Sequence, residues 1–174
     1  FIYCTGKKKV QKKRVPAFSL RLLFLIVVFF SITVQAKSTG LTKTIDSLQS
    51  LLNIAQEDTA KVNLLNTLFA KTRYQSTENA FPFAEQALKL ARKIAYKQGQ
   101  AKALENISLF YRLNNKIDKA IEYNTEALLI RNNLGAKAEI INSLMAGAEL
   151  YKFQLNYDKA LTHYLKALKI SEEF

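Results

Sequence analysis

The stretches DKAIEYNTEALLI (residues 118–130) and DKALTHYLKALKI (residues 158–170) are two copies of one pattern, placed 40 residues apart. Asp-Lys-Ala opens both copies, Ala-Leu recurs at 127–128 and 167–168, and Ile closes both at 130 and 170. The match extends to either side. Tyr111 corresponds to Tyr151 and Leu104 to Leu144. One period before the first of the two quoted stretches, the positions of Ala120, Ala127, Leu128 and Ile130 are held by Ala80, Ala87, Leu88 and Leu90. A fixed period of this length is the signature of a protein built from one recurring supersecondary unit.

Each repeat has the pattern of two amphipathic helices. The first-helix stripe follows the spacing i, i+3, i+4, i+7, which places its members on one helix face; it comprises Leu104, Ile107, Ser108 and Tyr111, then Leu144, Gly147, Ala148 and Tyr151. The second helix opens with an acid, where the helix dipole favours negative charge. Its inward stripe comprises Ala120, Tyr123, Asn124, Ala127 and Leu128, then Ala160, His163, Tyr164, Ala167 and Leu168. Because small residues let helices approach closely, we predict that Ala120 and Ala160 are almost fully buried between helices.

This pattern resembles the tetratricopeptide repeat (TPR) family, whose first helix carries a small residue and then Tyr, and whose second carries Ala, an aromatic residue and Ala. The matching residues are Ser108, Tyr111, Ala120 and Ala127 in one copy and Ala148, Tyr151, Ala160, Tyr164 and Ala167 in the next. The resemblance implies an all-α fold, a TPR-like right-handed superhelical solenoid of helix-turn-helix repeats. The repeats are expected over 59–174, at about 60–97, 98–136 and 137–174, with helices longer than those of the usual 34-residue unit.

The first repeat, at about 60–97, departs from the pattern. Lys71 stands where Tyr is expected, Leu68 replaces the small residue, and Pro82 is expected in the first turn of the second helix, where proline is tolerated. Residues 37–58 are expected to form an N-terminal capping helix, with Asp58 and Thr59 supplying the turn and N-cap before the next helix. One capping helix and three antiparallel pairs make seven helices.

Residues 1–36 have the order of a secretory signal peptide. A basic segment at 7–14 precedes an apolar run from Leu22 to Val34, and Val34-Gln35-Ala36 provides a cleavage site. An uncleaved anchor is the alternative, although the run is shorter than the ~20 residues that span a bilayer. We therefore expect export to the periplasmic or extracellular side of a bacterial inner membrane, and no membrane span in the mature chain.

The charge pattern argues against a nucleic-acid partner. The net charge is +12, but seven of the 26 basic residues lie in the first 36 positions, and from Lys37 onward 19 basic residues face 14 acids. The excess therefore belongs to the leader and not to a nucleic-acid surface.

The sequence carries no motif that indicates chemistry. There is no Gly-rich phosphate loop, metal-ligand pattern or paired-cysteine motif, so we expect no enzyme activity, cofactor or metal. His163 stands in the register of Tyr123, which favours a packing residue over a ligand or base.

Function is then expected on the concave surface, which the resemblance assigns to the first helices. The candidate peptide-binding face comprises Lys102, Glu105, Asn106, Leu109, Arg112, Asn142, Met145, Glu149 and Lys152, with Leu65, Asn66 and Phe69 added by the first copy. Mixed charges, amides and a few apolar side chains suit an extended peptide, although an ordinary solvated face has the same composition. The predicted function is a scaffold that binds a protein or peptide partner in this groove. The Lys/Asn/Arg clamp with which some TPR domains hold a C-terminal carboxylate is not reproduced.

An alternative function is the extracytoplasmic sensor region of a bacterial histidine kinase or helix-turn-helix regulator, which residues 58–107 resemble behind a signal peptide. A continuation beyond Phe174 is expected in either case, because the last helix, at about 157–173, lacks a Gly stop and a capping helix. Left uncovered, the face around Tyr164 and Leu168 would favour self-association.

Overall fold

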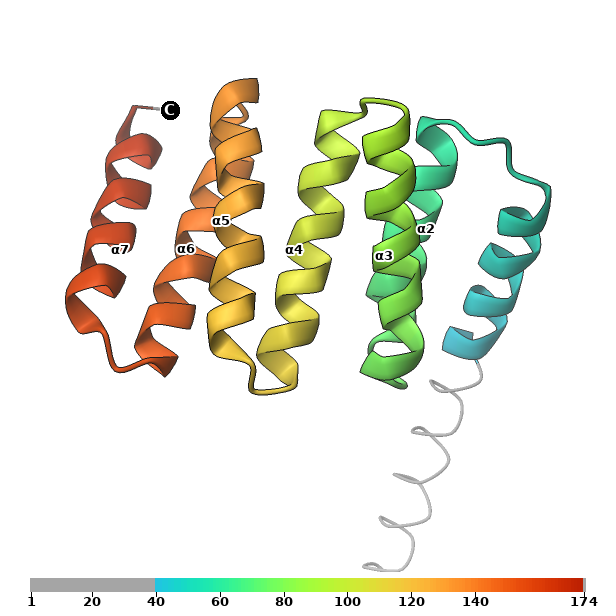
Figure 1. Cartoon of the computed structure of the whole chain (residues 1–174), viewed down its shortest axis with the longest axis horizontal. Coiled ribbons are helices and arrows are strands. Elements are labelled where there is room, and N and C mark those ends of the chain that lie inside the picture. Colours follow the sequence, from blue (N-terminus) through green and yellow to red (C-terminus); the bar gives the residue numbers. More distant parts are fainter. Residues whose placement is uncertain (1–39, 174) are drawn as a thin grey trace, which may run out of the picture. The chain divides into compact units, whose positions relative to one another are not determined.

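Seven successive helices make up residues 40–173, the part of the chain that the structure, a computed structural model, describes (Figure 1). A helix over 40–54 is followed by α2 (Thr59–Thr72), α3 (Thr77–Lys93), α4 (Lys97–Leu113), α5 (Ile117–Leu134), α6 (Lys137–Phe153) and α7 (Tyr157–Glu172). These residues contain no strand. The predicted signal peptide at 1–36 lies outside the described residues, as does Phe174. The all-α fold with seven helices is confirmed.

Side-chain caps fix the starts of α2, α3 and α7. The carboxylate of Asp58 accepts a hydrogen bond from the amide of Lys61 at 3.0 Å, as the sequence predicted for this turn. Ser76 caps α3 by accepting from the amide of Asn79 at 3.1 Å. Because this cap starts α3 at Thr77, Pro82 lies in the second turn, and its predicted place in the first turn is wrong. Proline there lacks the amide that would donate to the preceding turn.

The helices α3, α4, α5 and α6 end in the same way, with one residue in the left-handed region. These residues are Ala95, Asn115, Gly135 and Leu155, with φ between 56° and 65°. In each case the next amide reaches back five residues, as Tyr96 does to the carbonyl of Ala91 at 2.8 Å. This Schellman geometry pairs carbonyls that the helix end would otherwise leave without donors.

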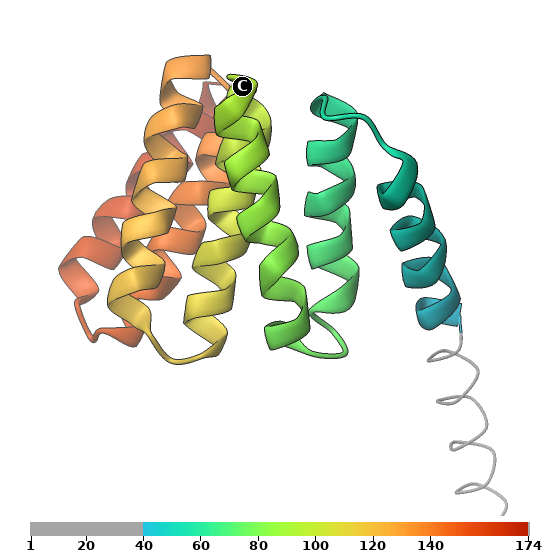
Figure 2. The ribbon, with the colours of Figure 1, turned by 45° about the vertical axis from the view of Figure 1, so that its right-hand side comes forward.

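Consecutive helices pack as antiparallel neighbours (Figures 1 and 2). Ala120 has no accessible surface and Ala160 is 3% exposed, which confirms the prediction for both positions. The hydroxyl of Ser108 in α4 donates to the carbonyl of Ala120 in α5 at 2.7 Å, so this contact has room for a hydrogen bond but not for a larger side chain.

The hydrophobic core is largest in the first two hairpins. One cluster of buried residues runs from α2 to α5 and contains Leu65, Phe69 and Leu104. A smaller cluster joins α6 to α7 around Ile140, Leu144 and Ala167. The only buried residues of α7 are Ala160 and Ala167, while its leucines are more than half exposed. The core therefore thins along the array.

Candidate functional site

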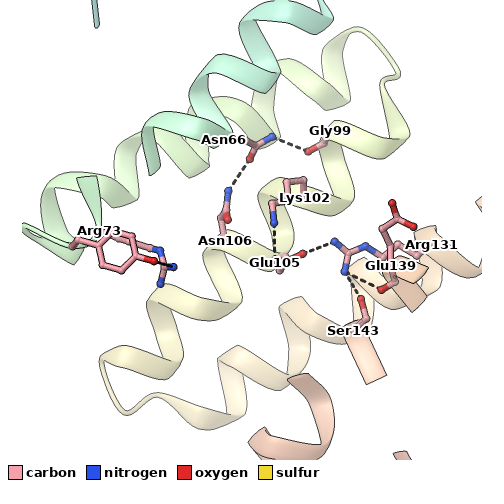
Figure 3. Close-up of polar contacts among 10 residues, drawn as sticks. Asn66, Arg73, Gly99, Lys102, Glu105, Asn106, Arg131, Glu139 and Ser143 are labelled. Carbon is pink, nitrogen blue, oxygen red and sulfur yellow. Dashed lines mark hydrogen bonds and ion pairs between the residues drawn. The ribbon is translucent and has the colours of Figure 1, made fainter. Parts of the chain in front are cut away.

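The first helices of successive repeats do not contact one another equally. α2 packs more closely against α4 than α4 packs against α6. At the closed contact, the side-chain amide of Asn106 donates to Asn66 Oδ1 at 2.9 Å, and Asn66 Nδ2 donates to the carbonyl of Gly99 at 3.4 Å (Figure 3). The two asparagines lie 40 residues apart, so one repeat position bonds to its own counterpart.

Between α4 and α6 the structure has a pocket of about 240 Å³. Its lining residues come from three helices: Glu105, Ser108, Leu109 and Arg112 from α4, Asn124 from α5, and Ala146, Glu149 and Leu150 from α6. Four of the nine predicted groove residues line it: Glu105, Leu109, Arg112 and Glu149. This pocket is the candidate functional site.

The floor of the pocket is rigid and partly polar. Ser108, Asn124 and Leu150 are all buried. Asn124 Nδ2 donates to the carbonyl of Ser143 at 3.0 Å, which ties α5 to α6 beneath the pocket. Ser108 is tied to α5 by its bond to Ala120. Because each polar floor residue is bonded to a neighbouring helix, the pocket is preformed.

The two carboxylates that line the pocket are already paired. Glu105 accepts hydrogen bonds from Arg131 and from Lys102, the latter at 2.8 Å. Partial burial opposes ionisation of Glu105, but these two donors outweigh it and hold its pKa below the ordinary glutamate value. The pKa of Glu149 is also lowered, first by the hydrogen bond from Tyr164 and then by that from Lys152. Both carboxylates are therefore charged near neutral pH.

Arg112 differs from the other charged groups of the pocket. Its guanidinium forms no hydrogen bond or salt bridge with any residue among those described. It is half-buried beside the pocket, and a guanidinium carries five N–H donors. The pocket thus offers one cation whose five donors are available to a ligand.

Arg131 supports the pocket from behind and was not among the predicted site residues. Its guanidinium contacts the carboxylate of Glu105 and the hydroxyl of Ser143, and lies 3.4 Å from the carbonyl of Glu139 (Figure 3). The side chain is only 6% exposed and links α4, α5 and α6. The signal was present in the sequence: Arg131 follows Ala120, Asn124 and Ala127 on the buried stripe of α5.

The other predicted groove residues are placed differently. Lys102, Asn142, Met145 and Lys152 are exposed and do not line the pocket, and Asn106 is buried with its side chain bonded to Asn66. The prediction that three residues of the first copy belong to the groove is wrong. Leu65, Asn66 and Phe69 are buried, because α2 packs against α4 and the helix over 40–54 adds Leu52 to the same core.

His163 occupies a packing position. Its ring centroid lies 5.0 Å from that of Tyr151, and Nδ1 is 3.0 Å from the carbonyl of Lys159. Within residues 40–173 no cluster of His, Cys, Asp and Glu has the arrangement of a metal site. No helix among these residues has the length and apolar character needed to cross a bilayer.

Stacked antiparallel helix pairs with a preformed pocket between successive first helices define the class of helical-repeat solenoid proteins. Residues 99–173 match the family model of the tetratricopeptide repeat. This segment, residues 99–173, therefore consists of tetratricopeptide repeats. TPR folds are interaction scaffolds and are in general not catalytic.

Solved structures show the same fold. BtubC (BKLC) from P. vanneervenii superposes with a TM-score of 0.71 at 20% sequence identity, over 78% of this chain and 58% of BtubC. The chain thus spans little more than half of that protein. The TPR domain of Arabidopsis FLU superposes with a TM-score of 0.60 at 19% identity, over 65% of this chain and 96% of that domain. No curated protein matches the sequence significantly.

Proposed function

We propose that the chain is a scaffold that binds an extended peptide segment of a partner protein along α4 and α6, with one acidic side chain of that peptide seated in the pocket beside Arg112. The observation that carries the proposal is the guanidinium of Arg112, which has no hydrogen-bond partner within residues 40–173, in a preformed pocket. A peptide carboxylate would meet two parallel donors there, the geometry in which arginine binds carboxylates most strongly.

The charges around the pocket favour the same ligand. The four cations Lys102, Arg112, Arg131 and Lys152 surround the two carboxylates of Glu105 and Glu149. Because both carboxylates are paired with other donors, they repel an incoming acid less than free carboxylates would. Leu109, Ala146 and Leu150 provide apolar contact for the methylene groups of a glutamate. The pocket therefore supports binding of an acidic side chain with an aliphatic stem.

Peptide selection on the immobilised full chain tests the proposal. A random peptide library should yield sequences that share an acidic residue, and a selected peptide should bind Arg112→Gln about ten-fold or more weakly, the loss of a charged hydrogen-bond pair. Ala146→Phe should fill the pocket with a similar loss. Lys166→Gln, an exposed cation on α7, is the matched control and should leave affinity unchanged. Selected peptides that bind all three variants equally would place the binding surface elsewhere.

We further propose that the scaffold acts outside the cytoplasm, on the basis of the leader pattern at residues 1–36. N-terminal sequencing of the chain from a fractionated bacterial host should find Lys37 at its start. A sensor region of a signalling protein is the second candidate role, supported by the resemblance of residues 58–107 noted above. Recovery of the chain with Leu22–Val34 still attached would favour an anchor.

A further inference from the structure

Three turns lie together at one end of the helices in residues 43–173. Because successive helices are antiparallel, the turns that follow α2, α4 and α6 are at the same end, and both views show them there (Figures 1 and 2). We call this surface the turn end; it comprises residues 71–79, 112–119 and 152–159. The side chain of Gln154 donates a hydrogen bond to the carboxylate of Asp118, which holds two of the three turns side by side.

Large apolar side chains project from the turn end. Phe153, Leu155 and Tyr157 surround the last turn, and Leu113 and Tyr74 belong to the other two. Each is at least half exposed, and Leu155 reaches 72%. Isolated exposed apolar residues need no explanation, but five at the tips of three adjacent turns form a surface that meets an apolar environment elsewhere.

Leu155 adopts a backbone conformation that is unfavourable for a leucine. Its φ is 59°, in the left-handed region that disfavours residues with a bulky side chain. The corresponding turn of the preceding repeat has Asn115 at φ 56°, and the turn between α5 and α6 has Gly135 at φ 65°. Asn and Gly are the residues that this conformation favours. Ala95, at φ 57°, also departs from this preference, but it lacks the large side chain that Leu155 exposes. Strain of this kind concentrates at functional sites.

Basic residues outnumber acidic residues in the three turns of the turn end. Apart from Arg112 and Lys152, which belong to the groove, the turn end holds five basic residues, Lys71, Arg73, Lys116, Lys119 and Lys159, and three acids, Glu78, Asp118 and Asp158. Asp118 is already bonded to Gln154. Exposed Phe, Leu and Tyr side chains in turns with an excess of basic residues are a composition that binds the interface of a membrane with anionic lipids.

We propose that the turn end docks on the surface of an anionic lipid bilayer. Phe153, Leu155 and Tyr157 enter the headgroup region, and Lys116 and Lys159 lie over the lipid phosphates. This inference goes beyond the groove and is independent of it, because the pocket opens between α4 and α6 and not at the turn tips. In a docked solenoid the helix axes would lie at a steep angle to the bilayer plane, and the groove would stay open to the aqueous phase.

The first test locates the contact residue by residue in the full chain. In a Cys4→Ser background, a single cysteine at Leu155→Cys carries an environment-sensitive dye, and Leu134→Cys, an exposed leucine at the opposite end, is the matched control. Vesicles of phosphatidylcholine with 30% phosphatidylserine should shift the dye at position 155 to shorter wavelength and protect it from an aqueous quencher. The dye at 134 should not respond. If the chain bound vesicles through its leader alone, both dyes would remain in water. That result would overturn the proposal.

The second test separates the apolar and charged contributions. Leu155→Asn, which copies Asn115, should raise the melting temperature and yet lower the vesicle partition coefficient about ten-fold, a combination that a purely structural leucine would not give. The control Leu168→Asn, on the exposed face of α7, should leave partitioning unchanged. The double variant Lys116→Gln with Lys159→Gln should lower the vesicle partition coefficient about 30-fold, because each lysine contributes about five-fold to six-fold. The control double variant Lys89→Gln with Lys166→Gln should leave the partition coefficient unchanged. Equal binding to pure phosphatidylcholine, or equal loss in the control variants, would refute membrane docking and leave a protein as the partner of this surface.

Discussion

Replacing Arg131 by methionine is the most informative single perturbation, because one buried side chain joins three helices behind the pocket. Arg131→Met keeps an unbranched apolar stem of similar bulk and removes the guanidinium with its charge and donors. The carboxylate of Glu105 would lose one of its two cationic partners, and Ser143 and the carbonyl of Glu139 would lose a donor. The change therefore tests the network and not the packing volume.

The expected loss follows from how well the partners are buried. Breaking a fully buried pair destabilises by about 3–5 kcal/mol, because an uncompensated charge stays in the interior. Here the arginine is 6% exposed but Glu105 is 35% exposed and retains Lys102 at 2.8 Å. We discount the loss by about half for this residual solvation. The expected decrease in the free energy of unfolding is about 2 kcal/mol.

Urea unfolding followed by circular dichroism measures this decrease, and the chain supplies a matched control. Arg92 pairs with Glu126 at 2.8 Å, but both side chains are more than a third exposed, so Arg92→Met should lose less than about 1 kcal/mol. A second variant tests the assignment further. Forty residues earlier, Leu65 and Ala91 stand at the positions of Glu105 and Arg131, and both are buried. The double variant Glu105→Leu with Arg131→Ala should therefore recover most of the loss. Arg131→Met and Arg92→Met of equal stability would refute the reasoning.

Three further outcomes are expected. Ala120→Leu should overpack the α4–α5 contact and lower the free energy of unfolding by about 1–3 kcal/mol, and a variant that melts like the parent would show that the register is wrong. Gly99→Ala should be destabilising despite its better helix propensity, because the added carbon would lie 2.6 Å from Val62 Cγ1; thermal melting of the variant checks this. The lowered pKa of Glu105 contributes stability that is present above the unfolded-state pKa and is lost as pH falls through the folded-state value. Acid titration of Glu105→Gln should accordingly show a shallower loss than the parent, and parallel curves would contradict the pairing with Arg131.

The fold was predictable because the repeat register encodes it redundantly. The 40-residue spacing predicted that Ala120 and Ala160 lie between helices, and Asp58 predicted a helix start. The structure agrees at all three positions. The place of Pro82 was misjudged although α3 keeps the register: α3, α5 and α7 begin at Thr77, Ile117 and Tyr157, each 40 residues apart. The 40-residue register therefore gives helix starts as well as packing positions.

The site was predictable only in part, because a stripe pattern assigns faces but not distances between helices. The prediction treated every first helix as equally accessible, whereas α2 and α4 close together through Asn66 and Asn106. The opening between α4 and α6 leaves a pocket lined by four of the predicted groove residues. Arg131 was missed because a charged residue on a buried stripe has no counterpart in the other copies, where Ala91 and Ser171 occupy its position.

The uneven core has a thermodynamic consequence for how the array opens. α3 buries six residues and α7 two, so nearest-neighbour coupling is strongest at the first two hairpins and weakest at the last. For residues 40–173 taken by themselves, such a gradient in a quasi-one-dimensional protein makes the α6–α7 hairpin the first cooperative unit to unfold. The pocket takes one wall from that hairpin. A ligand seated there would be linked to the opening equilibrium, and part of its binding free energy would appear as protection of α6 and α7 against hydrogen exchange.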